Sequence, residues 1–125
     1  MTSYMQSKPL KSEIRPWGRY EDYFRNGQVV FKIIYVAPQQ RLSLQLHRSR
    51  SEVWIHISGE GYALVDDQKI ELHSGNRIII ETEQTHRLVN IGSEELVVAE
   101  MQHGLCSESD IIRFSDDYGR GEAIL

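Results

Sequence analysis

Hydrophobic and polar residues alternate over short stretches of this chain, and helical periodicity is nearly absent. From Tyr20 onward, runs rich in β-branched and aromatic residues are separated by Gly, Asn, Asp and Ser, which is typical of strands joined by turns. The spacing of the runs suits two sheets folded into a roll. The pattern predicts strands over residues 20–24, 28–37, 42–47, 52–58, 61–65, 69–72, 76–81, 86–90 and 96–103.

Two segments lie outside this pattern. The first is polar until it reaches an Arg-Pro-Trp-Gly sequence, which favours a turn that lays Trp17 on the barrel. The second opens with Ser-Glu-Ser-Asp, which favours a short helical turn. At 125 residues the chain suits one hydrophobic core. We therefore expect a single domain over 1–125, with an arm at 1–18, a barrel at 19–106 and a C-terminal flap at 107–125.

Composition narrows the classes of partner. The chain is 40% hydrophobic and 26% charged, which is ordinary soluble usage, and no apolar run approaches the roughly 20 residues of a membrane helix. The start lacks the apolar centre of a secretion signal, so we expect a cytoplasmic protein. A net charge of -4 gives no basic excess for nucleic acid. The single cysteine, Cys106, cannot form an internal disulfide.

Polar residues alternate with leucine over residues 42–47, so one strand face would carry Ser43, Gln45 and His47. Polar groups that face a barrel interior cost free energy unless they find partners. A metal ion satisfies an imidazole and an amide carbonyl together, and Glu52 opens the next strand with a carboxylate. These residues alone leave a metal site and ordinary hydrogen bonding equally open.

Several of these residues fit the motifs of a known superfamily. Glu52 and Gly59, separated by six residues, resemble the end of the first cupin motif, and Gly75, His86 and Asn90 resemble the second. Longer stretches are similar to the C-terminal isomerase domain of type II phosphomannose isomerases. These stretches are residues 15–18 (Arg-Pro-Trp-Gly), 42–47 (Leu-Ser-Leu-Gln-Leu-His), 50–54 (Arg-Ser-Glu-Val-Trp) and 111–120 (Ile-Ile-Arg-Phe-Ser-Asp-Asp-Tyr-Gly-Arg).

The resemblance implies a fold and an activity. The fold is the cupin double-stranded β-helix, an all-β jelly-roll barrel. The activity is the interconversion of mannose 6-phosphate and fructose 6-phosphate with one divalent metal ion, for which zinc is expected and manganese, cobalt or nickel are alternatives. Carried over position by position, the ligands are Gln45, His47, Glu52 and His86. A small phosphorylated sugar is the implied partner.

Three further residues are candidates for catalysis. The resemblance places an important arginine at Arg120, and a guanidinium suits phosphate or enediolate oxygens. An exposed arginine on the tail is the alternative. Lys32 alternates with apolar neighbours, so it is either an inward lysine that binds phosphate or moves a proton, or an edge-strand lysine. Glu100 and Gln102 share a strand face and could line the same cavity, which makes Glu100 an acid-base candidate.

The chain also departs from the family pattern. Arg48 and Ser49 stand where the family has histidines, and Glu81 and Glu83 replace a Pro and a Gly. We expect these two carboxylates to face solvent. The departures leave open a non-catalytic cupin that binds a sugar or a metal, whereas a metal-dependent oxygenase would need more histidines.

The family resemblance and the N-terminal arm lead to two further expectations, about a transferase activity and about the oligomeric state. The family usually carries this domain behind a sugar-nucleotide transferase domain, which nothing here resembles, so no guanylyltransferase activity is expected of this chain. We expect a homodimer, formed through edge strands or a swapped arm.

Overall fold

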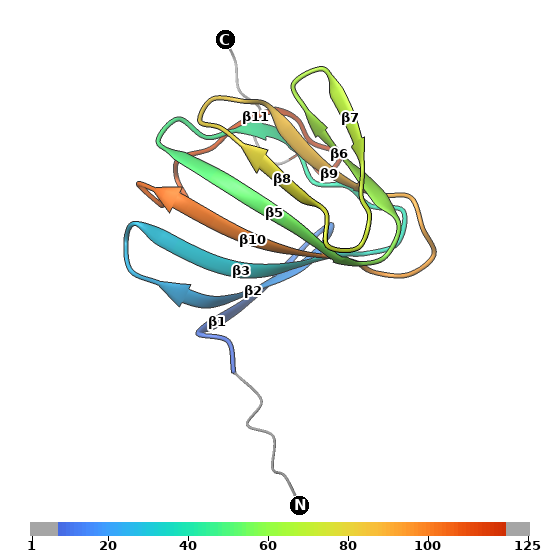
Figure 1. The fold of residues 1–125 in the computed structure, drawn as a ribbon, viewed down its shortest axis with the longest axis horizontal. Helices are drawn as coiled ribbons and strands as arrows, with labels where there is room; N and C mark the ends of the chain where they lie inside the picture. Colours follow the sequence, from blue (N-terminus) through green and yellow to red (C-terminus); the bar gives the residue numbers. More distant parts are fainter. Residues whose placement is uncertain (1–7, 120–125) are drawn as a thin grey trace, which may run out of the picture.

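The computed structural model describes residues 8–119, and every regular element among them is a β-strand. Figure 1 shows the strands arranged as two layers, with β1, β2 and β3 at the bottom and β6, β7 and β11 at the top. The strands are β1 (Lys11–Arg15), β2 (Gly18–Arg25), β3 (Val29–Val36), β4 (Leu44–Leu46), β5 (Arg50–Ser58), β6 (Gly61–Val65), β7 (Gln68–Glu71), β8 (Arg77–Ile80), β9 (His86–Asn90), β10 (Leu96–Gly104) and β11 (Ile112–Ser115).

The strands form two antiparallel sheets. The six-stranded sheet has the order β1-β2-β3-β10-β5-β8, and the five-stranded sheet has the order β11-β4-β9-β6-β7. Strands that are distant in sequence are therefore neighbours, as in a jelly roll, where the chain crosses repeatedly from one sheet to the other. The predicted all-β double-sheet roll is confirmed, and each predicted run contains a strand.

The segment expected to be an arm contains a strand. Lys11–Arg15 forms β1, which pairs with β2 along its whole length. The Pro-Trp turn reverses the chain, so that Arg15 lies opposite Gly18, and it buries Trp17 in the core. Only glycine fits at position 18, because a Cβ there would lie 2.0 Å from the carbonyl oxygen of Tyr35.

The predicted C-terminal helical turn is wrong among the described residues. At Ser107 the chain makes only a hydrogen-bonded turn, in which the Asp110 N–H donates to the Ser107 carbonyl at 3.0 Å. The chain then forms β11, which pairs with β4 and places Ile112 opposite Leu46. The free edge of β4 supplies backbone hydrogen bonds to β11, whereas a single helical turn over residues 107–110 is too short to be stable by itself.

The space between the sheets divides into an apolar part and a polar part. The hydrophobic core is built from inward side chains of both sheets, among them Trp54, Leu88 and Val98. Charged and polar side chains are also buried, among them Asp22, Lys32, His47, Arg50, Glu52, His86, Glu100 and Gln102. Over residues 8–119 there is no helix long and apolar enough to cross a membrane.

The six-stranded sheet has an apolar outer face. Ile33, Ala99 and Ile55 form one row across β3, β10 and β5 on that face. Glu21 and Arg77 lie at the two ends of the row. The outward side chains Ile79 and Met101 are 59% and 47% exposed.

Candidate metal centre and its cavity

His47, Glu52 and His86 converge at the polar end of the roll. His47 follows β4, Glu52 lies on β5 and His86 begins β9, so both sheets contribute. All three are buried, and one possible ligand atom from each lies within 4.8 Å of the others. The Nε2 atom of His47 is 3.3 Å from Glu52 Oε2, and that of His86 is 3.5 Å from Glu52 Oε1.

Backbone carbonyls fix the orientation of both imidazoles. His47 Nδ1 lies 2.6 Å from the Asp110 carbonyl oxygen, and His86 Nδ1 lies 2.9 Å from that of Gln84. A carbonyl only accepts, so each Nδ1 carries the proton and each Nε2, which lies near the Glu52 carboxyl group, keeps its lone pair. Burial, followed by the charge of Arg50, lowers the pKa of His47 to about 4. Burial also lowers the pKa of His86, so both rings are neutral at pH 7.

The donor set fits a divalent cation. Glu52 Oε1 and His86 Nε2 are buried and have no hydrogen-bond partner among the described residues. Burial, and then the charge of Glu100, raises the pKa of Glu52 well above its ordinary value. Two neutral imidazoles and one carboxyl group with unsatisfied atoms form the kind of set that a bound cation satisfies.

Gln45 lies beside this cluster. It occupies the position on β4 directly opposite His86 on β9, so the two side chains share a face. Its Oε1 accepts a hydrogen bond from Ser43 Oγ at 3.2 Å. The structure therefore brings the four predicted metal ligands to one end of the roll.

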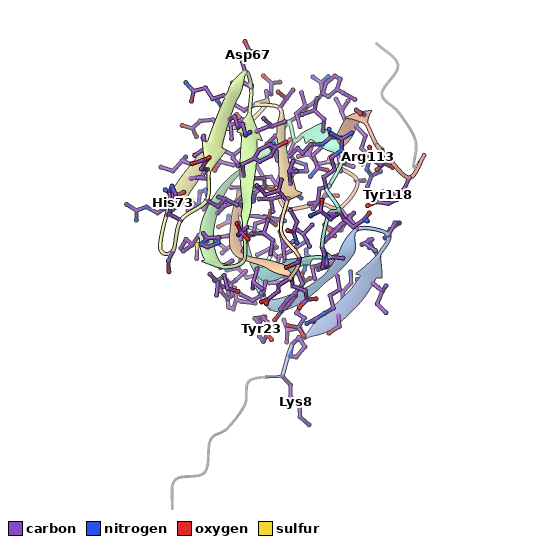
Figure 2. All side chains as sticks on the ribbon, turned by 90° about the vertical axis from the view of Figure 1, so that its right-hand side faces the viewer. Lys8, Tyr23, Asp67, His73, Arg113 and Tyr118 are labelled. Atoms are coloured by element: carbon purple, nitrogen blue, oxygen red, sulfur yellow. The ribbon has the colours of Figure 1, made fainter. Side chains whose placement is uncertain are left out.

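A cavity of about 160 Å³ opens next to the cluster. His47 and Gln45 line it, together with the cationic residues Arg15, Lys32, Arg50 and Arg113 and the carboxylates Glu100 and Glu108. Figure 2 shows Arg113 on the side of the molecule that also carries Tyr118. Although the whole chain has a net charge of -4, cations outnumber carboxylates along the cavity wall, which favours an anionic ligand.

Lys32 and Glu100 face each other across the β3–β10 pair inside the cavity. β3 is an inner strand of its sheet, so the edge-strand alternative for Lys32 is excluded. The Lys32 Nζ lies 3.6 Å from Glu108 Oε1 and 3.9 Å from Asp22 Oδ1.

The Glu100 carboxylate is held by neutral donors and by nearby charges. Trp54 Nε1–H donates to its Oε2 at 2.9 Å, and Gln102 Nε2–H donates to its Oε1 at 2.8 Å. Burial alone would raise the pKa of Glu100, but the charges of Lys32 and Arg50 lower it to about 2. The group is therefore ionised at neutral pH.

The sequence reasoning missed two residues that contact the cluster. The Arg50 guanidinium donates to Glu52 Oε2 at 3.0 Å and to His47 Nε2 at 3.1 Å. Its strand alternation with Glu52 could have indicated an inward side chain. The Asp110 carboxylate accepts the backbone N–H groups of Arg48 and Ser49, each at 2.9 Å. No local pattern marks Asp110, because its partners lie more than 60 residues away.

The remaining sequence expectations fall elsewhere. Arg120 lies outside the described residues. Glu81 and Glu83 are exposed, as expected, and an exposed ion pair of 3.8 Å joins Glu83 to Arg48. Glu83 has φ 66°, a backbone conformation that favours glycine, so the sharp turn persists with a residue less suited to it.

Comparisons with known proteins agree on the family. The model of the family described as "Mannose-6-phosphate isomerase C-terminal" matches residues 5–116. The alginate biosynthesis protein AlgA of Pseudomonas aeruginosa is 40% identical over 107 residues, which cover 85% of this chain and 22% of that protein. The mannose-1-phosphate guanylyltransferase of Escherichia coli is 35% identical, with 85% and 22% covered. The chain thus spans about a fifth of the length of these curated relatives.

Solved structures support the fold. The capsular polysaccharide assembling protein CapF of Staphylococcus aureus superposes with a TM-score of 0.71 at 19% identity, over 84% of this chain and 34% of that chain. A Klebsiella pneumoniae protein with a double-stranded beta-helix domain gives 0.66 at 16% identity, over 89% and 88%. The cupin domain of Cnp3 from Schizosaccharomyces pombe gives 0.65 at 9% identity, over 69% and 64%. The cupin double-stranded β-helix is confirmed.

Proposed function

This chain belongs to the family of mannose-6-phosphate isomerase C-terminal domains, and from that premise we propose that it is a metal-dependent isomerase of mannose 6-phosphate and fructose 6-phosphate. One observation carries the proposal: the His47, Glu52 and His86 cluster adjoins a cavity whose wall is cationic. A metal beside an anion-binding cavity suits a phosphorylated sugar, which presents both a phosphate and polarisable oxygens.

We assign the metal to Gln45, His47, Glu52 and His86, with zinc as the proposed ion. When bound, the ion supplies a Lewis acid that polarises substrate oxygens. The protein's own contribution is to hold both Nε2 lone pairs in place through the carbonyls of Asp110 and Gln84.

The cavity cations bind the phosphate in this proposal. Lys32, Arg15 and Arg113 each line the cavity, and guanidinium and ammonium groups form charge-assisted hydrogen bonds with phosphate oxygens. Arg120, which the family resemblance marks, is proposed to add a further contact to substrate charge.

Glu100 is the proposed base for proton transfer between C1 and C2 of the sugar. It is buried, it lines the cavity and it is ionised at neutral pH. A carboxylate with a pKa of about 2 is a weak base while Lys32 and Arg50 face it. A phosphate that engages Lys32 withdraws part of that compensating charge and raises the basicity of Glu100.

A coupled assay tests the proposal. Purified protein with added zinc, manganese or cobalt is expected to convert mannose 6-phosphate, and removal of the metal by a chelator is expected to abolish conversion. A protein that binds the metal and the sugar phosphate without turnover would instead be the non-catalytic cupin left open by Arg48 and Ser49 at positions where the family has histidines.

We also propose that the protein is a homodimer that covers the apolar outer face of the six-stranded sheet. The occupant is a second copy because Glu21 and Arg77 lie at opposite ends of the Ile33–Ala99–Ile55 row. A two-fold axis that lies above the middle of that row and runs parallel to the strands brings each acid opposite the partner's base.

A further inference from the structure

Arg50 donates a hydrogen bond to the same lone pair of His47 that would bind a cation. His47 donates its Nδ1–H to the Asp110 carbonyl, which leaves one lone pair, on Nε2. The Nη2 of Arg50 lies 3.1 Å from that Nε2. A hydrogen bond and a metal bond cannot use the same lone pair at once, so a cation that binds His47 displaces this contact.

Two further contacts hold the guanidinium against the cluster. Its Nε–H donates to Glu52 Oε2 at 3.0 Å, and its Nη1–H donates to the Ser107 carbonyl oxygen at 3.2 Å. Arg50 is only 7% exposed. The guanidinium therefore supplies one buried positive charge next to the Glu52 carboxyl group, at the place where a divalent ion would supply two.

Electrostatic repulsion also favours displacement of Arg50 by a bound cation, as the competition for the lone pair does. A divalent ion within a few ångströms of a guanidinium experiences strong repulsion in a poorly solvated site. Arg50 also lines the cavity, so its side chain has adjoining space that already contains Lys32, Arg15 and Arg113. A guanidinium leaving the cluster enters this space and adds to its positive charge.

We propose that Arg50 substitutes for the cation in the metal-free protein and moves into the cavity when a metal binds, where it becomes an anion ligand. This inference rests on the metal site of the proposed function. It couples the two halves of the site: the metal strengthens anion binding, and by linkage an anion strengthens metal binding by the same factor.

The first experiment measures metal affinity. Cobalt binding to the wild type is compared with binding to Arg50→Ala. Arg48→Ala is the control, because Arg48 is also an arginine but is exposed and forms its side-chain ion pair with Glu83. Arg50→Ala is expected to bind cobalt about tenfold more tightly or better, since the ion no longer displaces charge-assisted hydrogen bonds. Arg48→Ala is expected to stay within about twofold of the wild type.

The second experiment measures coupling. Binding of inorganic phosphate is titrated with saturating cobalt and again in EDTA-treated protein. The wild type is expected to gain phosphate affinity when cobalt is present. A bound metal attracts phosphate in either protein, so the contribution of Arg50 is the part of this gain that Arg50→Ala loses, about tenfold. Arg50→Gln, which keeps an uncharged N–H donor near the position of the arginine Nε, serves if the alanine variant does not fold.

The outcomes separate this inference from the proposed function. If the wild type binds cobalt and neither Arg50 variant binds it more tightly, the inference is overturned and the metal site stands. If the wild type binds no cobalt and Arg50→Ala does, the competition is supported. If no variant binds cobalt, the metal site and the inference both fail.

Discussion

Two adjacent rows of the six-stranded sheet, one facing inward and one facing outward, reverse the usual distribution of polarity, whereas most of the other inward side chains belong to the hydrophobic core. Asp22, Lys32, Glu100 and Trp54 form a row across four neighbouring strands, and all four side chains are buried inside the roll. The adjacent row faces outward and has Ile33, Ala99 and Ile55 at its centre, each of them a sequence neighbour of a residue in the inward row. An antiparallel sheet with one wet face ordinarily buries its apolar row and exposes its polar row.

We interpret the inward charged row as a feature that serves ligand binding rather than the stability of the fold. Buried charges destabilise a fold unless they are paired, and here each has partners: Lys32 has Glu108 and Asp22, and Glu100 has Trp54 and Gln102. Such a network is retained where a ligand needs it. The outer row instead carries apolar side chains, of which Ile55 is 41% exposed, and this fits a surface that a second copy covers.

The largest expected effect comes from the inner row. Glu100→Gln keeps the size of the side chain and a carbonyl oxygen for Trp54 but removes the charge. We expect kcat for mannose 6-phosphate to fall by about 10²–10⁴-fold, the range of a lost general base, with KM changed much less. Steady-state kinetics check this. Unaltered kcat would show that Glu100 is only structural.

Loss of an imidazole is expected to remove the metal. His47→Ala should weaken metal affinity by on the order of 100-fold or more, because loss of a metal ligand lowers the affinity at least as much as loss of a group that orients a ligand. Metal content after dialysis measures it. His103→Ala, on the outer face of the six-stranded sheet, is the control and should retain the metal. Equal metal content in both variants would contradict the ligand assignment.

The neutral state of His47 makes the metal-free protein sensitive to acid. Its pKa is about 4 in the folded protein and 6.5 in the unfolded chain, so the unfolded chain binds the extra proton first. The contribution of His47 to stability is complete above pH 6.5 and is lost as the pH falls toward 4. We expect the difference in free energy of unfolding between EDTA-treated wild type and His47→Gln to change by on the order of 2 kcal/mol over this window.

Urea unfolding at several pH values measures this difference. Glu52, whose pKa is raised, titrates in both proteins and largely cancels in the comparison. A difference that does not vary between pH 7 and pH 4 would mean that His47 is as readily protonated in the fold as in the unfolded chain.

The smallest expected effect lies on the outer face. Ile79 and Ile80 are neighbours on β8, but Ile79 is 59% exposed and Ile80 is 1% exposed. In urea unfolding of the monomer, Ile79→Ala is expected to change stability by less than about 0.5 kcal/mol, and the matched Ile80→Ala by about 2–5 kcal/mol. Sedimentation should show that Ile79→Ala weakens the dimer. An unaffected dimer would place the interface elsewhere.

Sequence patterns identified much of this molecule because strand alternation is local. A period of two along residues 42–47 was enough to place Gln45 and His47 on one face. The same rule made Lys32 and Glu100 candidates for inward positions, and the structure places both on the cavity wall. The strands β1 and β11 were missed, since they form by pairing with the edges of β2 and β4 rather than from a strong pattern of their own.

What the sequence determined by itself is the all-β roll, the positions of the strands β2 to β10 and the residue types available for a metal. The tertiary structure alone decided how those residues meet. It places the Arg50 guanidinium within hydrogen-bond distance of His47 Nε2 and the Asp110 carbonyl within hydrogen-bond distance of His47 Nδ1. It also brings the cationic side chains together along the cavity wall. The physical reason is that alternation fixes which face a side chain takes, whereas strand order and register fix its neighbours, and these depend on pairing between distant segments.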